Sequence, residues 1–203
     1  MNETAAIEEP GAGAKGDAPP KRKAAGKPPL RLLGLGMSRE PDTEQEVVAL
    51  FNALIGAGHL KGYDLLSVFG SSEKYDAVFR YEITKEAGTV GTEFLRLHES
   101  AFGRRDRIEF PPSMLEFKPL LSHLINDFEE GSKVLGEIKL AVAWDAGDEA
   151  AFNGSSEYRL EPCEQGSPRE KQFYGETHLL TMTTGPSKLH VILLRDVVGA
   201  LAT

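Results

Sequence analysis

Asp76, Glu116 and Lys118 carry the side chains best suited to chemistry on a charged substrate. Glu116 and Lys118 are separated by one residue, so in a strand they project from one face, while Phe117 points into the opposite layer. If the strand that holds Asp76 is a neighbour, its carboxylate can lie beside that of Glu116. Two carboxylates on rigid strands form an oxygen-ligand site for Mg²⁺ or Mn²⁺. A nearby lysine can position and help deprotonate a water, and can neutralise charge that develops on a phosphate.

A fourth candidate, Glu44, lies at the start of an expected helix. Thr43 and Glu46 match a capping box, which marks the N-terminus of that helix. At 100° per residue, Glu44 lies on the same side as Val47 and Phe51, which form the apolar face. A glutamate at the start of a buried face either curls outward at the helix end or points into a polar site beside the core, and both interpretations stay open.

The elements that must position these residues alternate between helices and strands. The first half is expected to contain a helix from residue 43 to about 56–58, strands at 62–69 and 75–83, a glycine-rich excursion at 84–112 with some strand content around 93–98, and a strand at 113–118 preceded by Pro111 and Pro112. The second half is expected to contain a helix at 120–130, a buried strand at 138–144, strands at 157–161, 176–182 and 189–194, and a short helix from about 196. This order predicts an α/β or α+β fold, in which helices flank one central mixed sheet.

The ordered combination of these residues and elements resembles the PD-(D/E)xK nuclease superfamily, whose restriction-endonuclease-like core has the order α-β-β-β-α-β. Residues 42–144 can be laid on that core element by element. The resemblance implies that Asp76 and Glu116 bind the metal and that Lys118 is the catalytic lysine. It also implies that Glu44 matches a glutamate that some members place on the first helix near the metal. Short segments are similar, in addition, to uncharacterised bacterial domains attached to ATPase or defence modules.

Two features depart from the fullest form of that motif. Tyr75 rather than a proline precedes Asp76, and the 39 residues between Asp76 and Glu116 require an insertion. The alternative to a metal site is a solvated strand face. In that interpretation, Asp76 caps the preceding turn or pairs with Lys74, and Glu116 and Lys118 face the solvent.

Two charged groups lie outside the motif. Arg104, Arg105 and Arg107 fall in the expected insertion and could contact a phosphate backbone, with a plain solvated loop as the alternative. The acidic segment 127–130 is expected to be a solvated helix end. Its negative charge opposes the helix dipole there, which hints at a cationic partner.

Composition limits the class of protein. The chain has 203 residues and a formal net charge of −8, and we expect a disordered tail or linker at 1–37 and one domain at 38–203. The tail carries six basic and four acidic residues, a net charge of +2, which leaves −10 for the domain. Cys163 is the only cysteine, so an intramolecular disulfide is excluded. No apolar run is long enough to span a bilayer, and no signal peptide is recognisable, so a cytoplasmic protein without membrane contact is expected.

The function expected from these observations is metal-dependent hydrolysis of nucleic acid, with DNA preferred over RNA. The resemblance places this activity in a bacterial defence (antiviral) or DNA-processing system, with a larger protein assembly or an ATPase as a partner. The alternative is a non-catalytic interaction module that keeps the nuclease-like fold. The acidic domain favours the alternative, but a metal site itself requires negative charge, and a bound ion would locally reverse it.

Overall fold

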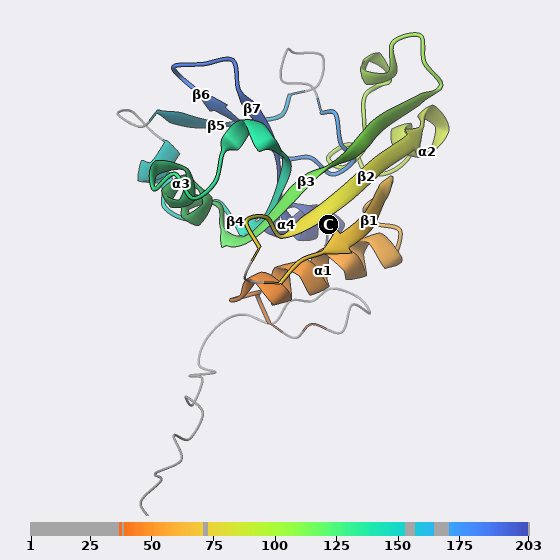
Figure 1. The fold of residues 1–203 in the computed structure, drawn as a ribbon. Helices are drawn as coiled ribbons and strands as arrows, with labels where there is room; N and C mark the ends of the chain where they lie inside the picture. The colour runs from red at the N-terminus through yellow and green to blue at the C-terminus, as the bar shows by residue number, and fades with distance from the viewer. Residues whose placement is uncertain (1–36, 38, 71–72, 153–156, 165–170, 203) are drawn as a thin grey trace, which may run out of the picture.

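The computed structural model describes residues 37, 39–70, 73–152, 157–164 and 171–202 (Figure 1). Apart from Met37, the tail expected at 1–37 lies outside the described residues. The helices are α1 (Glu44–Gly56), α2 (Lys85–Thr89), α3 (Leu121–Glu129) and α4 (Leu194–Leu201), with short 3₁₀ turns η1 (Glu99–Phe102), η2 (Leu135–Glu137) and η3 (Glu149–Phe152). The strands are β1 (Tyr63–Val68), β2 (Ala77–Thr84), β3 (Arg107–Leu120), β4 (Ile138–Asp145), β5 (Tyr158–Pro162), β6 (His178–Met182) and β7 (Lys188–Leu193). Within the described part of the chain, no helix is long and apolar enough to cross a bilayer.

The seven strands form one mixed sheet in the order β1-β2-β3-β4-β7-β6-β5. The first three strands are antiparallel, β4 lies parallel to both β3 and β7, and β7, β6 and β5 are again antiparallel. This arrangement confirms the expected α+β class with a mixed sheet flanked by helices (Figure 1).

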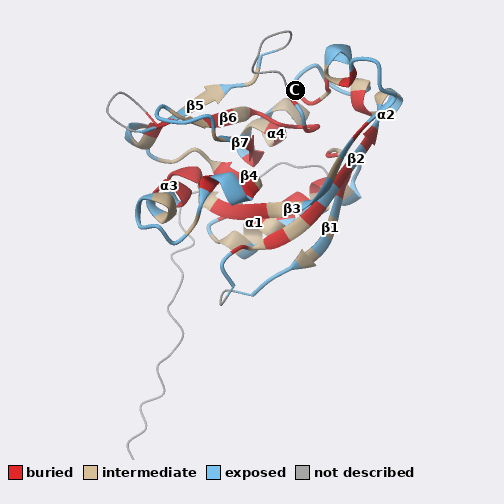
Figure 2. Cartoon of the chain, turned by 45° about the horizontal axis from the view of Figure 1, so that its top comes forward, coloured by how far each residue is buried: buried red, intermediate tan, exposed pale blue. Residues whose placement is uncertain are grey.

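Helices cover both faces of the sheet and create two apolar cores. On one face, α1 and α4 pack against the sheet, and the ring of Phe51 from α1 meets that of Phe117 edge-on, with 5.6 Å between centroids. On the other face, Leu124 of α3 packs in a cluster with Ala141 of β4 and Val191 of β7. The central strand β4 contributes to both cores, which explains its continuous apolar run. Figure 2 shows the buried residues along β2, β3 and β4 and more exposed residues on the edge strand β1.

Two expectations about the stretch before residue 113 are wrong. The Pro111–Pro112 pair does not precede the third strand but lies within it. The β2–β3 register is irregular at this point, because Tyr81 pairs with Phe110 whereas Phe79 pairs with Ser113. Both prolines are exposed at this irregularity, where a missing backbone N–H does not interrupt a regular ladder.

The second error concerns residues 93–98, where some strand content was expected. The structure has turns there, with the N–H groups of Leu95 and Arg96 both donating to the carbonyl of Thr92. Leu95 and Leu97 are buried two positions apart, which imitates the period of a strand. Both side chains have this spacing because they insert into the core beneath α1, and the backbone is not in a β conformation.

The contact between α1 and the sheet gives a stability prediction. Phe51→Ala removes a fully buried ring that also lies 5.3 Å from the ring of Tyr63, and we expect a loss of about 3–5 kcal/mol in the free energy of unfolding. Urea denaturation followed by circular dichroism measures the loss. Leu66→Ala, at a 48% exposed position on β1, is the control and should change stability by less than about 0.5 kcal/mol. Equal effects of the two substitutions would contradict the packing of α1 described above.

Candidate functional site

The candidate site lies just before β2 begins, where β3 continues beyond its pairing with β2. The last residue pair between these strands is Ala77 with Leu115, and one further step in the same register places Asp76 opposite Glu116. Beyond that point, β3 pairs only with β4. The side chain of Asp76 accepts a hydrogen bond from the backbone N–H of Phe117 at 2.7 Å, which a strand partner would otherwise have to satisfy. Asp76 therefore replaces the missing ladder and is held next to the Glu116 position.

Glu116 and Lys118 share one face of β3, as their spacing predicts. The Glu116 side chain is fully buried, that of Lys118 is 11% exposed, and Lys118 Nζ lies 3.5 Å from Glu116 Oε1. Phe117 points to the opposite face, into the core beneath α1. The alternative expectation of a solvated strand face is therefore wrong. In the same alternative, Lys74 was the expected partner of Asp76, but Lys74 pairs with Glu137 on the surface at 2.9 Å.

Glu44 points into the polar site. Lys118 Nζ donates a hydrogen bond to Glu44 Oε1 at 2.9 Å. The capping box of Thr43 and Glu46 is present and begins α1 at Glu44, so this carboxylate lies at the end of the helix closest to β3. Its side chain is 39% exposed, which places it at the mouth of the cluster. Of the two interpretations that the sequence left open, the structure supports the inward one.

The acidic end of α3 also belongs to the cluster. Asp127 Oδ2 lies 3.2 Å from Lys118 Nζ, while Glu129 and Glu130 are exposed. The expectation of a fully solvated helix end is thus wrong for Asp127. The cationic partner that the helix dipole hinted at is a lysine of the same chain.

Lys133 is the residue that sequence reasoning missed. Gly131 follows α3 with a φ of 72°, a conformation that glycine adopts at low cost after a helix. The backbone N–H groups of Ser132 and Lys133 then donate hydrogen bonds to the carbonyl of Asp127, at 3.0 and 3.2 Å. This turn brings the Lys133 ammonium group into an ion pair with Glu116 Oε1. The available signal was the glycine stop after an amphipathic helix, but it does not show which residue the turn would meet.

The cluster contains four carboxylates and two ammonium groups, so its formal net charge is −2. Burial lowers the pKa of Lys118, but its hydrogen bond to Glu44 and the charge of Asp127 outweigh burial and raise the pKa above the usual lysine value. Burial also lowers the pKa of Lys133, and the charges of Asp76 and Glu44 offset part of that effect. Lys118 is thus the more firmly charged of the two lysines.

Glu116 is the most unusual group of the cluster. Within the described residues, neither of its carboxylate oxygens has a hydrogen-bond partner, although the side chain is completely buried. Buried carboxylates normally accept hydrogen bonds or bind a metal. Asp127 Oδ2 is also buried, but it lies 3.2 Å from Lys118 Nζ and its side chain is 27% exposed. These hard oxygen donors fit Mg²⁺ or Mn²⁺ in their chemistry. In the described arrangement, however, no three acidic, histidine or cysteine side chains form a ready metal-binding group.

A small cavity adjoins the cluster on the α1 side. Its volume is about 150 Å³, and its lining includes Glu44, Asp76 and Phe117. This space is large enough for several waters. The cavity therefore suits an ion with its waters, or a reacting water.

The three arginines do not belong to this cluster. At about 3.3 Å per residue, β3 separates Arg107 from Glu116 by about 30 Å. Arg107 also pairs with Glu82 at 3.0 Å and with Glu109 at 3.7 Å. Arg104 and Arg105 are exposed and help to line a separate surface hollow of about 560 Å³. Any contact that they make with a nucleic acid is remote from the carboxylates.

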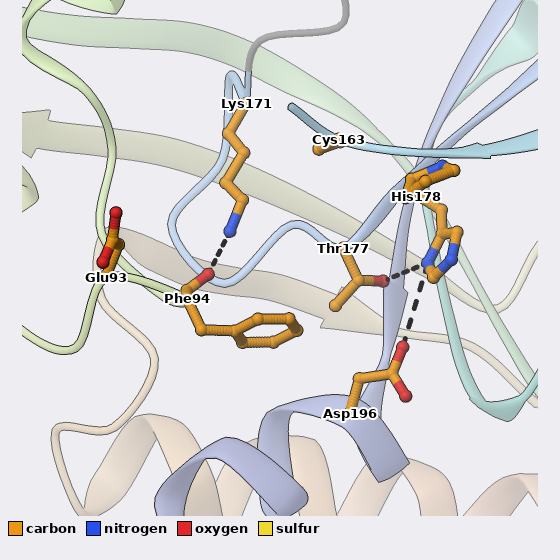
Figure 3. Close-up of a pocket in the computed structure, with 8 residues that line it drawn as sticks. Glu93, Phe94, Cys163, Lys171, Thr177, His178 and Asp196 are labelled. Atoms are coloured by element: carbon orange, nitrogen blue, oxygen red, sulfur yellow. Dashed lines mark hydrogen bonds and ion pairs between the residues drawn. The ribbon is translucent and has the colours of Figure 1, made fainter. Parts of the chain in front are cut away.

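A second polar pocket, of about 520 Å³, lies between the segment at 93–94, the ends of β5 and β6, and α4 (Figure 3). Lys171 Nζ donates to the carbonyl of Phe94, and burial lowers the pKa of this lysine. His178 Nδ1 lies 3.0 Å from Thr177 Oγ1 and 3.9 Å from Asp196 Oδ2. The carboxylates that line this pocket are exposed at Glu93 and partly exposed at Asp196, so neither is a buried carboxylate of the kind found at Glu116.

Comparisons with protein-family models, with curated proteins and with solved structures found no significant match to the chain. Function is therefore inferred from the geometry of this site and from the sequence motif.

The contact between Asp76 and β3 gives a prediction for the site. Asp76→Ala leaves the buried N–H of Phe117 without its acceptor, so the free energy of unfolding should fall by about 1–3 kcal/mol. Asp76→Asn keeps an acceptor oxygen and should lose clearly less. Chemical denaturation of both variants and the wild type measures the difference. An Asp76→Ala protein as stable as Asp76→Asn would show that the hydrogen bond does not hold this strand end.

Proposed function

We propose that the chain is a metal-dependent nuclease with its active site at Asp76, Glu116, Lys118 and Glu44. One observation carries this proposal: a fully buried glutamate, whose Oε2 has no hydrogen bond or ion pair among the described residues, lies beside two lysines and the register position of a second carboxylate. The order α1-β1-β2-β3-α3-β4, with β4 parallel to β3, supports it, because the nuclease core that the sequence resembles has this order. The proposal includes a restriction-endonuclease-like core formed by these elements.

Asp76 and Glu116 are the residues that would hold Mg²⁺ or Mn²⁺, with Asp127 and Glu44 as further oxygen donors nearby. Such an ion would polarise a phosphoryl oxygen and lower the pKa of a bound water. The buried side of the cluster excludes bulk water from Glu116, which strengthens its electrostatic interactions. The exposed side, at Glu44, is the side from which a substrate phosphate would approach.

Lys118 would act through its charge. Glu44 and Asp127 raise its pKa above the usual lysine value despite burial, so the amine stays protonated at neutral pH. A protonated lysine cannot accept a proton from water, but it can orient the scissile phosphate and neutralise the negative charge that develops on it. Its contacts with two carboxylates, Glu44 at 2.9 Å and Asp127 at 3.2 Å, support the charge-neutralising role of the two expected for this lysine.

The substrate proposed is DNA in preference to RNA. The sequence resemblance supports this choice, together with a cytoplasmic role in bacterial defence or DNA processing and an ATPase or larger assembly as partner. Because the domain is acidic, binding requires local positive charge or a partner protein. Arg104 and Arg105 are exposed and can supply such a patch, whereas Arg107 is largely neutralised by Glu82 and Glu109.

A non-catalytic interaction module with the same fold is the second candidate. The observation that favours it is the ion pair between Lys133 and Glu116, because a permanently paired Glu116 could not bind a metal. In that case the cluster would only join α3 to β3. Calorimetry with Mn²⁺ distinguishes the two candidates, since the module would give no heat of binding.

The nuclease proposal predicts how the site variants behave. Glu116→Gln should abolish Mn²⁺-dependent cleavage, and Lys118→Met should reduce its rate by about 10²- to 10³-fold, the usual cost of removing one group that stabilises charge in the transition state. Cleavage of end-labelled single- and double-stranded DNA is followed on denaturing gels. Glu109→Gln, at an exposed position on β3, is the matched control and should cleave like the wild type. Undiminished cleavage by a folded Glu116→Gln protein would refute the proposed active site.

The arginine patch gives a separate prediction about DNA affinity. The double variant Arg104→Ala/Arg105→Ala should bind DNA more weakly, and the slope of log K against log salt concentration should become shallower by about 1 for each phosphate that the protein no longer neutralises. Fluorescence anisotropy at several salt concentrations measures the slope. Arg107→Ala serves as the control, with a smaller change, because Glu82 and Glu109 already neutralise this guanidinium. An unchanged slope in the double variant would remove the patch from the DNA interface.

A further inference from the structure

The ammonium group of Lys133 lies where a cation bound by Glu116 would lie. It forms an ion pair with Glu116 Oε1 and lies 3.9 Å from Asp127 Oδ2. The charges of Asp76 and Glu44 also act on it. Lys133 therefore contacts the proposed metal ligand Glu116 and lies near Asp127, and its side chain is only 12% exposed.

The Lys133 ammonium group occupies the position that a cation bound to Glu116 Oε1 would take, because it contacts this oxygen directly. A divalent ion on that oxygen would displace Lys133, since like charges in a buried site repel. Lys118 Nζ lies farther from the same oxygen, at 3.5 Å. Without the lysine, conversely, Glu116 would be a buried carboxylate with Lys118 as its only described ionic partner, at 3.5 Å, which is costly for the folded protein.

The surrounding chain allows Lys133 to move but holds Lys118 in place. Lys133 follows α3 in a turn whose neighbours Ser132 and Val134 are exposed. Lys118 lies within β3, pairs with Ala143 of β4 in the ladder, and contacts carboxylates of α1, β3 and α3. Rotation of one long side chain moves the Lys133 charge to solvent without unfolding any strand or helix.

We propose that Lys133 is a tethered competitor for the divalent cation: its ammonium group neutralises Glu116 in the metal-free protein and leaves when the metal binds. The inference rests on the proposed metal site but not on cleavage of any substrate. In this proposal, the turn after α3 controls the metal affinity of the site through the position of Lys133. A partner that draws Lys133 outward, such as an acidic or phosphorylated surface, would raise that affinity.

Titration calorimetry with Mn²⁺ alone tests the competition. Lys133→Met keeps the apolar stem and removes the charge, so it should bind Mn²⁺ at least about tenfold more tightly than the wild type. Its thermal unfolding temperature should be lower without metal and should rise more on Mn²⁺ addition. Lys85→Met removes a partly exposed lysine that pairs with Glu99 and should match the wild type. Equal or weaker binding by Lys133→Met, or no binding by either protein, overturns the proposal.

A measurement on the unmodified chain covers the case in which Lys133→Met does not fold. Acetic anhydride labels accessible amines, and mass spectrometry gives the extent at each lysine with and without saturating Mn²⁺. Lys133 should become several-fold more reactive with Mn²⁺, while Lys85 stays constant. Unchanged or lower reactivity of Lys133 overturns the proposal. Tighter Mn²⁺ binding by Lys133→Met without any DNA cleavage would uphold the competition and refute the nuclease function.

Discussion

The burial of the Glu116 carboxylate is the constraint on which the rest of the site depends. Transfer of one charged group out of water costs several kcal/mol even after the protein relaxes. Two lysines meet this cost, Lys118 from the same strand and Lys133 from the turn after α3. Lys118 is in turn paired with Glu44 and Asp127, and Lys133 lies 3.9 Å from Asp127. The N-terminus of α1 and the C-terminus of α3 are thereby joined to β3 through one electrostatic cluster.

Such a cluster is a poor means of gaining stability, since well-packed apolar residues of similar volume often stabilise a protein as much or more. Phe117 and Leu115, on the opposite face of the same strand, show that β3 can form an ordinary apolar core. A buried carboxylate at Glu116, whose Oε2 has no partner among the described residues, therefore favours a function over a purely structural role. The start of β2 at Ala77 also favours a function, because β3 has no β2 partner beyond Leu115 and one of its edges is open beside that carboxylate.

Some features could not be predicted because the local pattern was ambiguous. Leu95 and Leu97 have the spacing of a strand, yet they enter the core from turns. The Pro111–Pro112 pair is typical of a strand boundary, but a shift of register lets β3 pass through it. The local pattern does not distinguish these cases, because the partner strand and the core, not the segment itself, supply the deciding contacts.

The amino-acid sequence by itself determined the beginning of α1 through the Thr43 and Glu46 box, the common face of Glu116 and Lys118, and the buried character of β4. Each depends on neighbours within a few residues, so a helical or strand period is enough to specify it. Only the tertiary structure decided that Asp76 binds the N–H of Phe117 and that Lys133 meets Glu116. These contacts depend on where the pairing of β2 with β3 begins and on how α3 packs over the sheet. Both features arise from contacts between segments that are far apart in the sequence, so a local period cannot predict them.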